Sequence, residues 1–118
     1  MKKVVFIFWV LCFAWGITSS DPVFGQDKIK LGFIADMPGI GATFYKSQKQ
    51  AIDLFIEETN AKGGILGKKL ELVVRDSQLK PDVGSNVARE LILNEKCDFL
   101  IGPTSSAVAL AVTKVAQE

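Results

Sequence analysis

The chain has 118 residues, of which 48% are hydrophobic, and its 14 basic and 13 acidic residues leave a formal net charge of +1. A chain of this length holds one small domain. The nearly neutral balance includes no basic patch of the kind that binds nucleic acid or an anionic membrane surface. Because the sequence contains no histidine, a histidine-based catalytic triad or metal site is excluded within this span.

The start of the chain has the composition of a secretory signal peptide. Met1 to Lys3 is basic, Val4 to Ile17 is almost purely apolar, and Thr18 to Ser20 is small or polar. The apolar run is short for a membrane span, which takes about 20 residues. A cleaved export signal is therefore favoured over an uncleaved membrane anchor.

Cleavage is predicted after Gly25, with cleavage after Ser20 as the alternative. Structured sequence begins at about Asp27, which favours the later position. This prediction divides the chain into a signal peptide at residues 1–25 and a folded segment at residues 26–118, and it implies a periplasmic location for the exported protein.

Three short apolar runs are predicted to be buried strands. They are Lys28–Ala35 (KIKLGFIA), Lys69–Arg75 (KLELVVR) and Asp98–Ile101 (DFLI). Cys97, the one cysteine that remains after signal cleavage, directly precedes the third run. We expect it to be a buried structural thiol, because free cysteine packs as a small apolar residue.

Helical periodicity follows each run, beginning with a first helix from about Phe44 to Asn60. Gly63 and Gly64 follow as left-handed caps that end it. The residues expected to form its buried stripe are Ala51, Ile52 and Phe55.

A second helix is predicted to begin at Pro81, because proline is tolerated in the first turn, where no N–H is needed. A third begins near Ser105 and is still running at Glu118. Their apolar stripes are Val83, Val87, Ala88, Leu91 and Ile92 in the second helix and Val108, Val112 and Val115 in the third.

The alternation of strands and helices predicts an α/β fold, a three-layer β-α-β-α-β-α arrangement around a parallel sheet with right-handed crossovers. An open sheet of three parallel strands leaves a long edge unpaired and apolar faces uncovered. We therefore expect the chain to be the first part of a larger protein.

Two loops are candidates for ligand binding. Ligands of open parallel sheets bind beyond the carboxyl ends of the strands, where strand order reverses. If the first strand is central, these loops are Asp36–Phe44 and Gly102–Ser106. The second leads directly into a helix, whose free N–H groups attract a carboxylate, and Ser105 and Ser106 would add hydroxyl donors. The alternative is that Thr104 or Ser105 only caps the helix.

Other motifs in the chain do not match nucleotide-binding patterns. Gly39–Gly41 follows the first strand, but Phe44 stands where a dinucleotide fingerprint needs glycine. Gly67–Lys69 precedes a strand and lacks the hydroxyl residue of a phosphate-binding loop. Asp36 and Asp76 at strand ends could bind a metal or an amine, although such residues more often cap loops. No nucleophile–base pair is present, so we predict neither catalysis nor a cofactor or metal.

The sequence resembles the periplasmic binding proteins of the leucine/isoleucine/valine-binding type over residues 28–118. The resemblance is carried by the stretches IKLGFIADMPGIGATF, AIDLFIEETNAKGGILGKKLELVVRDSQLKP and VARELILNEKCDFLIGPTSSAVALAV. Its most specific parts are the NAKGG turn at Asn60–Gly64, followed by Gly67, and the IGPTSS segment at Ile101–Ser106.

This resemblance implies a type I periplasmic binding protein fold, in which two α/β lobes close on a ligand by a hinge motion. The chain corresponds to the start of the first lobe. In amino-acid-binding members, the serine at the position of Ser106 meets the ligand carboxylate through its hydroxyl and backbone N–H. Ser105 and Thr104 are neighbouring pocket positions. Phe44 stands where an aromatic side chain covers the ligand, but Tyr45 follows it where many members have glycine.

The resemblance also implies a function. The protein would be the substrate-binding component of an ATP-binding-cassette importer, which captures a branched-chain or other amino acid and delivers it to a membrane permease. One alternative is the ligand-sensing domain of a receptor or amide-type sensor with the same fold. Another is an exported enzyme on a similar sheet, against which the absence of histidine and of any nucleophile motif argues.

Overall fold

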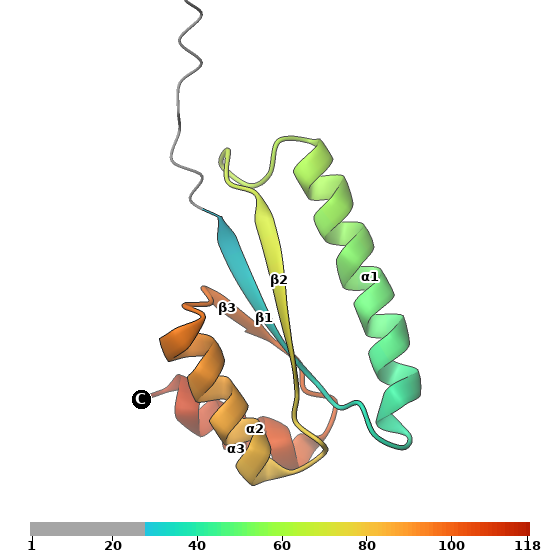
Figure 1. Cartoon of the computed structure of the whole chain (residues 1–118), viewed down its shortest axis with the longest axis vertical. Coiled ribbons are helices and arrows are strands. Elements are labelled where there is room, and N and C mark those ends of the chain that lie inside the picture. The colour runs from blue at the N-terminus through green and yellow to red at the C-terminus, as the bar shows by residue number, and fades with distance from the viewer. Residues whose placement is uncertain (1–27) are drawn as a thin grey trace, which may run out of the picture.

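The computed structural model describes residues 28–118, and the predicted signal peptide lies outside the described residues. Strands and helices alternate as predicted (Figure 1). The elements are β1 (Ile29–Ala35), α1 (Gly41–Ala61), β2 (Leu70–Asp76), α2 (Pro81–Arg89), the π-helical η1 (Glu90–Asn94), β3 (Phe99–Ile101) and α3 (Ser106–Ala116). None of the helices in this part of the chain is long and apolar enough to cross a membrane.

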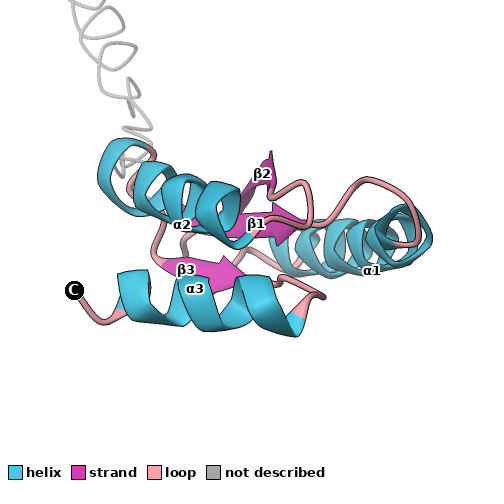
Figure 2. Ribbon diagram, turned by 90° about the horizontal axis from the view of Figure 1, so that it is seen from below, coloured by secondary structure: helices cyan, strands magenta, loops and turns pink. Residues whose placement is uncertain are grey.

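The sheet is parallel, with the strand order β2-β1-β3. The chain moves from β1 to β2 in one direction and from β2 past β1 to β3 in the other. With right-handed crossovers, this reversal requires the connecting helices to lie on opposite faces of the sheet. Accordingly, α1 covers one face and α2 and α3 cover the other (Figures 1 and 2). The predicted three-layer α/β fold is confirmed.

The main core lies between the sheet and the pair α2 and α3. Gly84 of α2 lets the two helices approach closely, because a Cβ atom there would overlap the side chain of Val108. The apolar stripes predicted for these two helices supply most of the core. Its buried members are Ile34, Val87, Ala88, Leu91, Val108, Val112 and Val115.

The opposite face of the sheet carries α1, which begins three residues earlier than predicted. The ring of Phe33 from β1 stacks on that of Tyr45, with 6.0 Å between ring centroids. The stripe predicted for this helix is only partly correct, because Ile52 is half-buried whereas Ala51 is exposed and Phe55 is 53% exposed. The side of α1 that faces the sheet is therefore marked by Tyr45 and Ile52, which are half-buried.

The turn between α1 and β2 explains the NAKGG motif. The side chain of Asn60 donates to the carbonyl of Leu70 at 2.9 Å and accepts from its N–H at 2.7 Å, so it pairs with the start of β2 as a neighbouring strand would. Gly63 and Gly64 both have positive φ, as predicted for left-handed caps. Gly64 also approaches the carbonyl of Lys68 too closely for any side chain.

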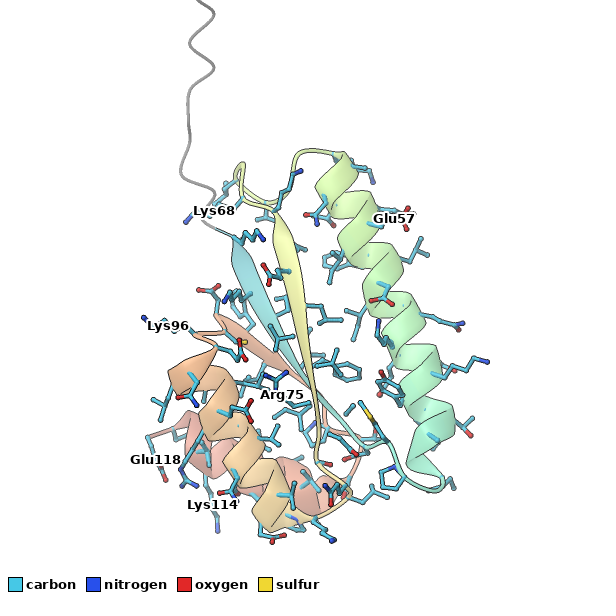
Figure 3. All side chains as sticks on the ribbon, viewed as in Figure 1. Glu57, Lys68, Arg75, Lys96, Lys114 and Glu118 are labelled. Atoms are coloured by element: carbon cyan, nitrogen blue, oxygen red, sulfur yellow. The ribbon has the colours of Figure 1, made fainter. Side chains whose placement is uncertain are left out.

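After α2 the helix widens into the π-helical turn η1, which the periodicity did not predict. Arg75 of β2 lies between the sheet and this turn (Figure 3). Its guanidinium donates to Glu90 at 2.7 Å and to Glu95 at 2.6 Å, and these bonds raise the pKa of Arg75. At the other end of the chain, α3 ends at Ala116 and does not run to Glu118.

Candidate functional site

The carboxyl ends of β1 and β3 meet where the strand order reverses, which is where an open parallel sheet binds its ligands. The loop after β1 leads to α1 on one face of the sheet, and the loop after β3 leads to α3 on the other (Figure 2). The two predicted loops therefore diverge from a common point, as the predicted central position of β1 required.

Asp36, the residue that follows β1, places a carboxylate between the carboxyl ends of the strands. Its side chain is almost fully buried, with 2% of its surface exposed. One carboxylate oxygen, Oδ2, accepts the backbone N–H groups of Thr104 at 2.8 Å and Ser105 at 2.7 Å. The other, Oδ1, accepts the hydroxyl of Ser77. A single carboxylate thus joins the segments that follow all three strands.

Asp76, the last residue of β2, has a more local role. Its Oδ1 accepts the N–H of Met37 at 3.1 Å and that of Gln78 at 2.9 Å. Both strand-end aspartates therefore cap loops, which agrees with the simpler of the two interpretations drawn from the sequence. Within residues 28–118, no group of three or more acidic or cysteine side chains is placed to hold a metal ion.

The start of α3 holds two of the predicted site residues. Ser105 occupies the N-cap position with extended backbone angles (φ −72°, ψ 122°), but its side chain makes no capping hydrogen bond. Neither the Ser105 nor the Ser106 hydroxyl has a hydrogen-bond partner among the described residues. Since Asp36 already takes the N–H groups of Thr104 and Ser105, the donors left for a ligand are the first N–H groups of the helix proper and the two hydroxyls.

Of the other two predicted residues, Thr104 contacts α1 from the loop after β3, and Phe44 lies on α1 itself. The hydroxyl of Thr104 donates to Oε1 of Gln48 on α1 at 3.4 Å. Phe44 lies one turn before Gln48, on the same side of the helix, and is 49% exposed. It belongs to the first turn of α1 and not to the preceding loop as the sequence suggested.

Three residues near the carboxyl ends of the strands make contacts that were not predicted from the sequence. Asp36 carried a signal, because a polar residue directly after a buried strand often caps a loop, but its partners were not predicted. Ser77 and Gln48 carried none, because they lie 41 and 56 positions from their partners in the sequence. Contacts of that range depend on how the strands are ordered.

Two further features lie away from this point. A groove of about 340 Å³ between α2 and α3 includes Ser85, Arg89 and Lys114 in its lining and none of the four predicted site residues. Cys97, before β3, is half-buried. Burial, followed by the nearby charge of Glu95, raises the pKa of its thiol, which fits an unreactive cysteine with a packing role.

Comparison with known proteins identifies relatives over the whole described region. The family model described as "Periplasmic binding protein" matches residues 28–118. The Leu/Ile/Val-binding protein BraC3 of Rhizobium johnstonii is 33% identical over 90 residues, which cover 76% of this chain and 24% of that protein. Leu/Ile/Val-binding protein homolog 2 of Brucella abortus is 31% identical over 120 residues, covering all of this chain and 30% of the relative.

Solved structures show the same fold. The branched-chain amino acid transporter substrate-binding protein LivJ of Streptococcus pneumoniae, in complex with isoleucine, matches with a TM-score of 0.71 and 29% identity, covering 76% of this chain and 26% of that one. A solute-binding protein of an ABC transporter from Rhodopseudomonas palustris, in complex with benzoate, matches with a TM-score of 0.67 and 27% identity, covering 75% and 24%. The chain thus spans about a quarter of the length of these relatives.

Proposed function

Because this chain belongs to the periplasmic binding proteins of the Leu/Ile/Val-binding type, we propose that it is the first part of a substrate-binding component of an ABC importer. The described segment forms the beginning of the amino-terminal lobe in this proposal. The full protein captures a small solute in the periplasm and passes it to a membrane permease. The observation that supports this role most directly is the family match over residues 28–118.

The ligand in this proposal is an amino acid or a related small carboxylate. The two structural relatives described above hold isoleucine and benzoate, and both of these ligands carry a carboxylate attached to an apolar body. A helix start attracts a carboxylate through its free N–H groups and its partial positive charge. The start of α3 at Ser106 is such a helix start and lies at the carboxyl end of β3.

Each predicted site residue has a separate role. The N–H and hydroxyl of Ser106 bind the ligand carboxylate, and the free hydroxyl of Ser105 adds a second donor. Thr104 contributes less directly, because both its N–H and its hydroxyl already bond to protein atoms. The exposed ring of Phe44 packs on the apolar body of the ligand from the side of α1.

Replacing Ser106 by alanine in the full-length protein tests this assignment. The variant loses a hydrogen bond to a charged group, which is worth about 1.5–3 kcal/mol, or about ten- to a hundredfold in affinity. Isothermal titration calorimetry with L-isoleucine and with benzoate measures the loss. Thr113→Ala is the matched control, because that hydroxyl lies on the same helix and bonds only to the carbonyl of Ala109. Unchanged affinity in Ser106→Ala for a ligand that the wild type binds would remove Ser106 from the site.

Export forms a separate part of the proposal. The family implies a periplasmic location, and residues 1–25 supply the cleaved signal. Mass spectrometry of protein recovered from the periplasm is expected to show an amino terminus at Gln26. An amino terminus at Asp21 would support the alternative cleavage site, and retention of Met1 would contradict a cleaved signal.

A further inference from the structure

We infer that Asp36 is a positioning residue for the ligand site: its buried carboxylate sets the direction in which the chain enters α3 and so fixes where the Ser106 N–H and hydroxyl lie. This inference rests on the proposed function for its ligand. It adds a residue that touches no ligand and whose effect on binding passes through the backbone of Thr104 and Ser105.

Asp36 is held in place by contacts with two strands and the segments that follow them. The residue follows the central strand β1, and its carboxylate accepts the hydroxyl of Ser77 from the segment after β2. Ser77 is itself fixed, because its N–H donates to the carbonyl of Ala35 at 2.8 Å and its hydroxyl accepts the N–H of Leu79 at 3.1 Å. The carboxylate therefore has a defined place before it meets the loop after β3.

The loop after β3 is bonded to Asp36 through its backbone. One oxygen of Asp36 accepts two consecutive backbone N–H groups, those of Thr104 and Ser105, at 2.8 and 2.7 Å. These lengths fit charge-assisted hydrogen bonds, which are about twice as strong as neutral ones. Two consecutive N–H groups converging on one oxygen restrict the backbone of both residues. The next residue, Ser106, is the first whose N–H is left for an external acceptor.

Asp36 also keeps a ligand away from the backbone amides of Thr104 and Ser105. The two N–H groups immediately before the helix, those of Thr104 and Ser105, already donate to the Asp36 carboxylate. A ligand carboxylate must therefore bind one step further along, at the start of α3 proper. Asp36 consequently sets the inner boundary of the site as well as the orientation of its donors.

The competing explanation is that Asp36 stabilises the fold without any particular effect on the ligand site. Asp76 provides the comparison, because it also lies at a strand end and also accepts two backbone N–H groups, those of Met37 and Gln78. It makes no bond to the loop that enters α3. Among variants that remain folded, a general stabilising role predicts near wild-type affinity whichever aspartate is replaced, whereas positioning predicts a specific loss of affinity when Asp36 is replaced.

The test uses the full-length protein with Asp36→Ala, Asp36→Asn and Asp76→Ala. Calorimetry with L-isoleucine and benzoate measures affinity, and hydrogen exchange without ligand measures protection of the Thr104–Ser106 amides. Asp36→Ala is expected to weaken binding about tenfold or more and to speed exchange. Asp36→Asn should retain part of the affinity and part of the exchange protection, because the carbonyl oxygen of asparagine can still accept both N–H groups. Asp76→Ala should stay within about threefold of the wild type.

Equal affinity losses in Asp36→Ala and Asp76→Ala, or wild-type affinity in Asp36→Ala, would overturn the inference. If Asp36→Ala does not fold, Asp36→Asn decides: an affinity loss of several-fold with faster exchange at Thr104–Ser106 supports positioning, and wild-type values for both overturn it. If the wild type binds neither probe, the ligand assignment in the proposed function fails. Exchange rates of the Thr104–Ser106 amides then decide alone whether Asp36 positions the start of α3: faster exchange in the Asp36 variants supports it, and wild-type exchange overturns it.

Discussion

Gly102→Ala is expected to lower the free energy of unfolding by several kcal/mol and to disturb the ligand site with it. Gly102 has φ +83°, and a left-handed backbone costs about 1–2 kcal/mol for a residue with a side chain. The new Cβ atom would also overlap the carbonyl oxygen of Ile34 in the neighbouring strand β1. Forcing atoms into a packed region adds about 1–3 kcal/mol.

Gly39→Ala is the matched control for this substitution. Gly39 also has a positive φ, of +59°, but a Cβ atom there would have no neighbour within 4 Å. Gly39→Ala is expected to lower the free energy of unfolding only by the cost of a left-handed backbone, about 1–2 kcal/mol. Urea denaturation of the full-length variants measures the difference between the two, and that difference isolates the overlap with Ile34.

The same substitution has a consequence for binding. Because Gly102 begins the loop that leads to Thr104 and Ser106, a backbone shift at its position moves the start of α3. Ligand affinity should therefore fall in Gly102→Ala and remain near the wild-type value in Gly39→Ala. Equal stability losses in the two variants, or equal affinities, would contradict the close approach between this loop and β1.

Local patterns in the sequence predicted most of the fold. The stripes of α2 and α3 were correct because both helices pack on the sheet and on each other, so apolar periodicity and burial coincide. The stripe of α1 was less accurate. It packs mainly on the sheet, and its apolar residues Phe55 and Leu54 remain 53% and 57% exposed. Periodicity marks which residues are apolar, and burial depends on which neighbours are present.

The contacts at the candidate ligand site were predicted less completely than the fold. The position of Ser105 and Ser106 at a helix start was identifiable because a hydroxyl-rich segment follows a strand and begins a helix, which is a local signal. The role of Asp36 was not identifiable, because its partners Thr104 and Ser105 lie 68 and 69 positions away. They become neighbours only through the strand order β2-β1-β3. Local sequence thus indicated the donors at the helix start but not the carboxylate that holds them.

The π-helical turn η1 carries two leucines that differ sharply in burial. Leu91 is fully buried, with 0% of its surface exposed, and its side chain packs beside Gly32 of β1. Leu93, two residues later, is 68% exposed. Residues two apart on a helix do not share a face, so the same substitution at the two positions should have very different consequences.

Leu91→Ala is expected to lower the free energy of unfolding by about 2–5 kcal/mol, because it leaves a cavity between η1 and the sheet. Leu93→Ala should change it by no more than about 0.5 kcal/mol. Urea denaturation of both full-length variants, with unchanged slopes, gives the two values. Since the chemistry of the substitution is identical and the positions share one turn, helix propensity cancels in the comparison. The difference between the two variants therefore measures the burial of Leu91 directly, and equal losses would contradict the orientation of η1 against β1.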